Sequence, residues 1–139
     1  MGNKILVGVI ASLVVIQLLP LGPNRENPPV LAEPPWVGEQ TRALFFAACG
    51  DCHSNETAWP WYSHVAPASW LLAHDVEEGR EHFNVSEWGR EKQDADEAVE
   101  MLEEGEMPLL LYWLTHGPAR LSKEEERQLL DGMAATFGT

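Results

Sequence analysis

The apolar positions of this chain fall into one continuous N-terminal stretch and several shorter helical patterns. Residues 5–21 carry few polar side chains, and Lys4 is the only charged residue before them. From Val37 to Ala48, apolar and small side chains recur with the helical period, which predicts a helix that runs directly into Cys49. No stretch alternates between apolar and polar residues for long enough to predict a strand. The pattern therefore predicts an all-α fold.

Stop and capping signals predict three further helices and, between the last two of them, one short apolar turn. The middle one of the three has a box-like D-x-x-E start, and the last one has an S-x-x-E capping box. The predicted limits are Pro67 to between Gly79 and Phe83, Asp94 to Gly105, residues 109–114 for the turn, and Ser122 onward for the last helix.

The N-terminal apolar stretch is close to the minimum length for a membrane span. We expect residues 1–21 to form an uncleaved signal anchor and transmembrane helix, residues 22–36 a Pro-rich extended stalk, and residues 37–139 a helical domain. Lys4 predicts a cytoplasmic N-terminus, which would make this a single-pass protein of the bacterial inner membrane with its domain on the periplasmic side. Cleavage after Val30-Leu31-Ala32 is the alternative.

Cys49-Gly50-Asp51-Cys52-His53 is a CxxCH motif, the attachment sequence of c-type haem. Each thiol can add to one vinyl group of haem, and the histidine that follows is placed to bind the iron as proximal ligand. The motif predicts one covalent haem c per chain. A zinc site and a redox dithiol are the alternatives, but the sequence has no second CxxC or HxxxH pair to complete a zinc site.

Met107 is the predicted second axial ligand. It lies between the Gly105 helix stop and Pro108, so a loop would present its sulfur to the iron. His53 and Met107 are thus the predicted metal ligands, and with Cys49 and Cys52 they form the predicted cofactor-binding set. No catalytic residue is predicted.

The remaining methionines, histidines and aromatic residues receive secondary roles. Met133 fits the apolar stripe of the last helix, and Met101 lies off the main stripe of its helix and is not treated as a rival ligand. His74 either ligates or bonds to Glu78, His116 either caps a helix or donates to a haem propionate, and His64 and His82 are expected to be exposed. A cluster of aromatic residues is expected to shield the haem from water: Trp59, Trp61, Tyr62 and Trp70.

Several short blocks, taken in order, resemble the small single-haem domain family known as the bacterial haem-binding domain (c-type, CxxCH). The resemblance covers about residues 45 to 132 and implies an exported, covalently bound haem c with no agreed reaction. Its blocks are Cys49-Gly-Asp-Cys-His-Ser54, Trp59-Pro-Trp-Tyr-Ser63, Ala66-Pro-Ala-Ser-Trp70, Asp75-Val-Glu-Glu-Gly-Arg80, Ser86-Glu-Trp88, Gly105-Glu-Met-Pro108 and Ala119-Arg-Leu-Ser122. The helix before the motif and the last helix also resemble the terminal helices of small class I cytochromes c, which predicts a cytochrome c-like domain.

The formal net charge of −13 excludes nucleic acid as a partner and favours a partner protein with a basic surface. We therefore expect a membrane-anchored monohaem cytochrome c that carries single electrons between redox protein partners and is not an enzyme. Two alternatives stay open. The first is a haem-bearing accessory subunit of a larger membrane redox complex. The second is a haem sensor or peroxidase with an open sixth site.

Overall fold

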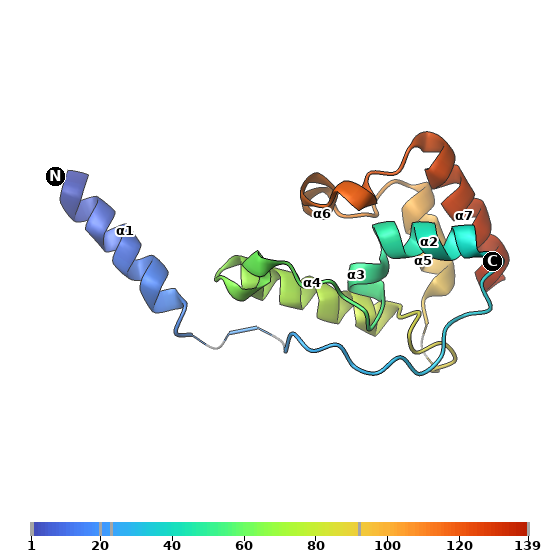
Figure 1. Ribbon diagram of the computed structural model, residues 1–139, viewed down its shortest axis with the longest axis horizontal. Helices are drawn as coiled ribbons and strands as arrows, with labels where there is room; N and C mark the ends of the chain where they lie inside the picture. Colours follow the sequence, from blue (N-terminus) through green and yellow to red (C-terminus); the bar gives the residue numbers. More distant parts are fainter. Residues whose placement is uncertain (1, 20, 23, 92, 139) are drawn as a thin grey trace.

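The computed structural model describes residues 2–19, 21–22, 24–91 and 93–138. Helices and connecting loops make up this part of the chain, which contains no strand, so the all-α prediction is confirmed (Figure 1). The elements are listed in chain order: α1 Gly2–Ile16, α2 Glu39–Ala48, α3 Gly50–His53, η1 Trp61–His64, α4 Ala68–His82, α5 Ala95–Glu103, α6 Leu110–Thr115, η2 Gly117–Ala119 and α7 Lys123–Phe137.

Helix α1 is shorter than the predicted transmembrane helix. It ends after 15 residues at Ile16, which corresponds to a length of ~22 Å, against a hydrocarbon layer of about 30 Å. Within the described residues, no helix combines the length and the apolar character that crossing a membrane requires. The predicted transmembrane helix over residues 1–21 is therefore wrong, and so is the predicted single-pass placement in the bacterial inner membrane.

The side chain of Gln17 joins the end of α1 to the helical domain. Its Nε2 donates to the carbonyl oxygen of Ala66 over 3.1 Å, and its Oε1 accepts from the backbone N–H of Ala66 over 2.9 Å. These two bonds satisfy both polar atoms of the Ala66 backbone, which lies just before α4.

The described part of the Pro-rich segment over residues 24–36 contains no helix and lies along the domain. The Leu31 N–H donates to the Ser86 carbonyl over 2.8 Å, and the Trp88 N–H donates to the Ala32 carbonyl over 3.0 Å. At the C-terminal end of the segment, the Trp36 ring packs on the Phe45 ring with the two centroids 5.2 Å apart. Because the segment shares hydrogen bonds and core contacts with the domain, it is a strap around the domain and not a spacer that holds it at a distance.

The core lies between α2, α5 and α7 and is completed by the chain that follows α4. Its buried apolar side chains are Leu44, Phe45, Ala48, Phe83, Val85, Leu102, Leu129 and Met133. Helices α2 and α7 approach closely at Gly132, where an added Cβ would clash with the side chain of Thr41. Glycine is therefore what allows the last helix to rest against the helix that leads into the CxxCH motif.

The predicted caps at the two helix starts have different outcomes. Ser122 and Glu125 form the expected reciprocal capping box at the start of α7, so that prediction is confirmed. Asp94 occupies the N-cap position of α5, as predicted, but its side chain makes no capping bond to that helix. The Asp94 carboxylate instead lies 3.2 Å from Nδ1 of His82, at the end of α4.

Glu33 anchors the strap to α2. Its carboxylate accepts two hydrogen bonds from Arg42 and one from the Trp36 indole N–H, each 2.7 Å long. The Arg42 hydrogen bonds hold the pKa of Glu33 below its ordinary value. The stabilisation is therefore complete above the unfolded pKa of 4.5 and is lost as the pH falls through the lower folded value.

We expect Glu33→Gln to lower the free energy of unfolding by about 1 kcal/mol at neutral pH, because both partners stay partly exposed and solvent screens the pair. The difference from the unmodified protein should shrink as the pH falls below 4.5, because the Glu33 carboxylate becomes protonated. Urea unfolding at about pH 7 and about pH 3 measures both effects. Glu100→Gln, an exposed change on α5, is the control and should have little effect at either pH. A loss that persists unchanged in acid would contradict the assignment.

Candidate haem site

The CxxCH motif forms its own helical turn. Cys49 is the C-cap residue of α2, and the next four residues form α3, in which the His53 N–H donates to the Cys49 carbonyl over 3.0 Å. This turn brings both thiols and the imidazole to one end of α2. Helix α4 packs directly on it, since an added Cβ at Gly79 would lie 2.7 Å from the Cys52 carbonyl oxygen.

A cavity of about 310 Å³ opens beside α3, within the range of small-molecule and cofactor sites. Its lining includes Cys49, Cys52 and His53 from the motif and Met107 from the loop after α5. Apolar side chains from α2, α5 and α7 form other parts of its walls, and residues of α4 and α6 also line it. The structure thus brings all four predicted cofactor-binding residues to one mainly apolar cavity.

The imidazole of His53 is held by two backbone carbonyls. Its Nδ1 lies 3.1 Å from the Gly79 oxygen and 3.0 Å from the Phe83 oxygen. Since carbonyl oxygens only accept hydrogen bonds, Nδ1 carries the proton and Nε2 keeps its lone pair. Desolvation lowers the pKa of His53 and so favours the neutral ring. A neutral imidazole with one fixed N–H and one free lone pair suits an iron ligand.

The two thiols lie in a desolvated environment. Burial raises the pKa of both Cys49 and Cys52 to about 12, so neither is an activated thiolate. This counts against the redox dithiol, which needs a lowered thiol pKa. Among the described residues, no group of three or more His, Cys, Asp or Glu side chains is arranged to hold a metal ion, which counts against the zinc alternative.

The loop that carries Met107 is fixed by a Schellman motif at the end of α5. Gly105 adopts a left-handed conformation with φ 72°, the Gly105 N–H donates to the Leu102 carbonyl, and the Glu106 N–H donates to the Met101 carbonyl. The Met107 N–H also donates to the Met101 carbonyl, over 3.2 Å. The stop signal at Gly105 therefore sets the direction in which the chain presents Met107.

The other two methionines of the domain also line the cavity. Met133 is buried in the core, as its stripe on α7 predicts. The sequence pattern predicts no ligand role for Met101, but the structure places it in the cavity wall together with Met107. Three methionines thus line the cavity, and because Met133 is part of the packed core, Met101 and Met107 are the two that experiment must distinguish.

Tyr112 links α6 to the motif across the cavity. Its hydroxyl donates to Oδ2 of Asp51 over 2.8 Å, and its ring stacks on His116 with centroids 4.0 Å apart. Burial, followed by the nearby Asp51 carboxylate, raises the pKa of Tyr112 above its ordinary value, so it stays a neutral donor. The sequence analysis did not identify Tyr112; its place in the short apolar turn resembled ordinary core packing.

Most of the secondary predictions concern residues outside the cavity. None of Trp59, Trp61, Tyr62 and Trp70 lines it, and Trp61 is 78% exposed, so the expected aromatic shield lies elsewhere on the surface. His74 bonds to Glu78 over 3.3 Å, the simpler of its two predicted roles. His64 and His82 are exposed, as predicted, although His82 also lines the cavity.

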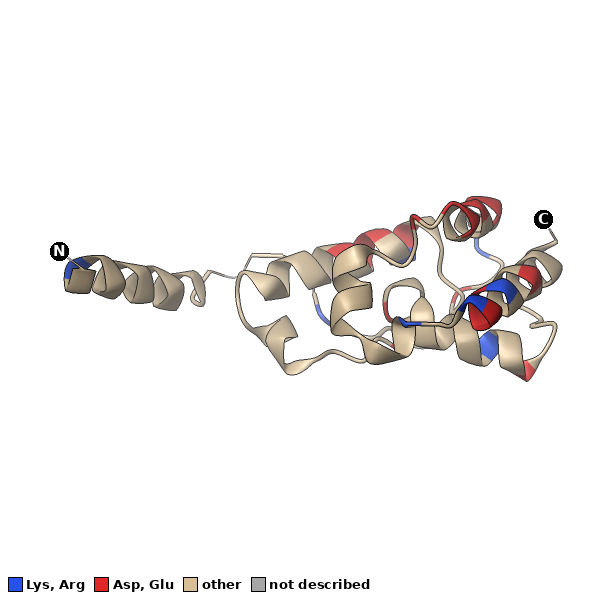
Figure 2. Ribbon diagram, turned by 90° about the horizontal axis from the view of Figure 1, so that it is seen from above, with Lys and Arg blue, Asp and Glu red and all other residues tan. Residues whose placement is uncertain are grey.

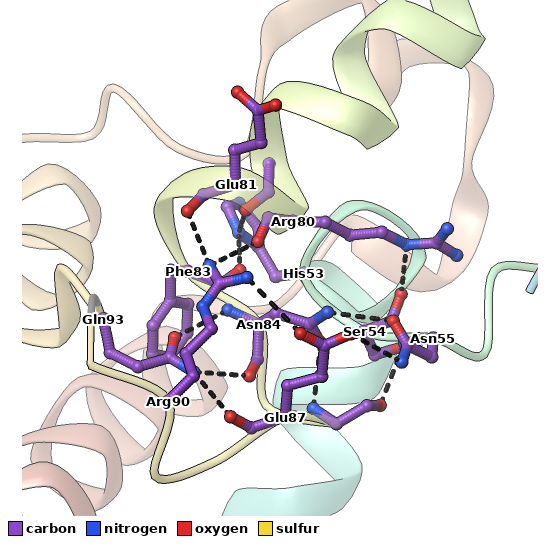
Figure 3. A network of polar contacts seen from close by, with 12 residues as sticks. His53, Ser54, Asn55, Arg80, Glu81, Phe83, Asn84, Glu87, Arg90 and Gln93 are labelled. Atoms are coloured by element: carbon purple, nitrogen blue, oxygen red, sulfur yellow. Dashed lines mark hydrogen bonds and ion pairs between the residues drawn. The ribbon is translucent and has the colours of Figure 1, made fainter. Parts of the chain in front are cut away.

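A buried polar network lies behind His53 (Figure 3). Asn84 donates to the side chain of Asn55 over 2.9 Å, and Asn55 in turn donates to the strap at Pro29 over 3.0 Å. Arg80 donates to the carbonyl of Ser54 over 2.8 Å. Every buried side-chain nitrogen and oxygen in the described part of the chain has a partner. This network fixes the two carbonyl-bearing segments against which His53 rests.

The fold and this site define a helical haem protein. Residues 11–135 match the family model of the haem-binding domain, and the chain belongs to this family. The matched range begins within α1 and includes the strap as well as the cavity. No curated protein and no solved structure matches the chain.

Proposed function

We propose that the protein binds one haem c covalently, through thioether bonds to Cys49 and Cys52. The placement of both Cys49 and Cys52 in the wall of the cavity, together with His53, carries this proposal. Addition of an S–H group across each vinyl group consumes the thiol proton, so the raised thiol pKa values do not oppose the finished bond. His53 would hold the iron from the motif side, and a methionine sulfur would hold it from the α5 side. When bound, the haem supplies an iron that changes oxidation state by one electron.

We further propose that the protein carries single electrons. An iron held by both a histidine and a methionine has no free position for a small molecule, and Met ligation favours a high reduction potential. The apolar walls of the cavity limit solvent rearrangement around the iron. These features support a carrier over a sensor or a peroxidase, which needs an open sixth position.

The electron-exchange partner is proposed to be a protein with a basic surface. Acidic side chains stand at the rim of the cavity: Asp75 and Glu78 of α4, Asp94, and Glu97 of α5. Further acidic residues lie along α5 and, mixed with basic ones, along α7 (Figure 2), whereas α6 has no charged residue. An acidic rim around a redox centre steers a basic partner toward it, and the rate should fall with added salt.

The ligand assignment can be tested with Met107→Ala and Met101→Ala. We expect Met107→Ala to abolish the far-red sulfur-to-iron absorption band and to lower the reduction potential, because the thioether ligand is lost. Almost all of the ferrous Met107→Ala protein should bind carbon monoxide. Absorption spectra of reduced and oxidised protein, with and without carbon monoxide, measure all three effects.

Met101→Ala is the matched control, since it removes a thioether from the same cavity wall. It should keep the far-red band. The opposite result, with the band lost in Met101→Ala and kept in Met107→Ala, would reassign the ligand to Met101. Rapid carbon monoxide binding by the unmodified ferrous protein would exclude the six-coordinate carrier and favour the sensor or peroxidase alternative.

A further inference from the structure

The peptide group between Phe83 and Asn84 has hydrogen-bond partners at both ends. Its carbonyl oxygen, on Phe83, lies 3.0 Å from Nδ1 of His53. Its N–H, on Asn84, donates to Oε1 of Gln93 over 2.9 Å. One planar, polarisable unit therefore connects the imidazole of His53 to the side chain of Gln93 (Figure 3).

The orientation of the Gln93 amide follows from its surroundings. Its Nε2 donates to the Asn84 carbonyl over 3.0 Å and to the Glu87 carbonyl over 3.1 Å. The reversed amide would point an oxygen at two carbonyl oxygens and an NH₂ group at an N–H. Gln93 therefore presents its oxygen to the Phe83–Asn84 peptide.

The second acceptor of His53 is less available. The Gly79 carbonyl also accepts the Phe83 N–H over 3.0 Å, as part of the last turn of α4. The Gly79 oxygen therefore accepts from two donors, the His53 Nδ1–H and the Phe83 N–H. The Phe83 carbonyl is the acceptor whose strength a neighbouring group can change.

We propose that Gln93 is a positioning residue that tunes His53 through the Phe83–Asn84 peptide. By accepting from the Asn84 N–H, Gln93 polarises the peptide and makes the Phe83 oxygen a stronger acceptor. A stronger acceptor draws the Nδ1 proton away from the His53 ring and makes the ring a more electron-donating ligand. Gln93 thereby holds the reduction potential of the bound iron lower than the His–Met ligands alone would set it. This inference rests on the proposed function, in which His53 binds the haem iron.

The test uses haem-loaded Gln93→Leu, which keeps most of the side-chain volume and removes the acceptor. We expect the reduction equilibrium to shift toward the reduced form by about threefold to tenfold, which is about 30 to 59 mV at about 59 mV per tenfold for one electron. In ferrous protein, NMR should show the His53 Nδ1 proton moving toward the position of a weaker hydrogen bond. Gln128→Leu is the matched control on the exposed side of α7, where the amide donates to Glu124, and it should change neither value.

A merely structural role predicts a different result. In that case Gln93→Leu would lower the melting temperature but leave the potential and the Nδ1 proton unchanged, and the absence of either shift overturns the proposal. If Gln93→Leu does not fold, the proposal can still be tested on the unmodified ferrous protein. A scalar coupling across the hydrogen bond between the Asn84 nitrogen and the Gln93 side-chain carbonyl carbon is expected, and its absence overturns the proposal. If the unmodified protein shows no histidine-ligated iron, the proposed function fails, whatever Gln93 does.

Discussion

Replacing Cys49 and Cys52 together with alanine is expected to remove all covalently bound haem. Both thiols line the cavity beside His53, so they are the groups placed to bond to a porphyrin held there. Each single replacement leaves one thiol and should retain part of the attachment. Haem staining after denaturing electrophoresis and the mass of the intact protein measure this directly, because denaturation releases any haem held only by ligation to iron.

Met107→Ala is the control for the cysteine experiment. It changes a predicted iron ligand in the same cavity but leaves both thiols, so its denatured chain should still stain. A double cysteine variant that stains as strongly as the unmodified protein would contradict covalent attachment at these positions. An unmodified protein that does not stain, after expression with a haem attachment system, would contradict it as well.

Gly79→Ala is expected to destabilise the domain by about 1–3 kcal/mol and to lower its haem content. The new Cβ would lie 2.7 Å from the Cys52 carbonyl oxygen and 3.1 Å from the Cys52 Cβ. A backbone oxygen cannot rotate away, so α4 must move off α3. That movement displaces the Gly79 carbonyl from Nδ1 of His53. The clash outweighs the gain of about 1 kcal/mol in helix propensity that alanine brings.

Gly8→Ala is the matched control for the Gly79 experiment. Gly8 also lies inside a helix, but an added Cβ there would have no atom within 4 Å. This variant should be as stable as the unmodified protein or slightly more stable. Urea unfolding and the haem-to-protein ratio measure both variants. A Gly79→Ala protein with unchanged stability would show that α3 and α4 are not packed so closely.

The order of the helices could be predicted from the sequence because their signals are local. Apolar periodicity, the capping box at Ser122 and the stop at Gly105 each act within one or two turns of chain. At Asp94 the same local signals predicted the N-cap position but not the side-chain contact, because the carboxylate pairs with His82, which is 12 residues earlier in the chain. The prediction of a transmembrane helix was wrong because an apolar run does not determine where its helix ends.

The haem motif itself is a property of five consecutive residues, so the sequence determined the predicted thiol positions and the proximal histidine. Only the tertiary structure placed Met101 beside Met107, Tyr112 on Asp51 and Gln93 behind His53. These pairs are separated by long stretches of chain or by turns whose direction depends on packing. Their geometry is set by where α4, α5 and α6 come to rest against α3. The sequence by itself thus determined which cofactor to expect, whereas the packing of the helices decided what surrounds it.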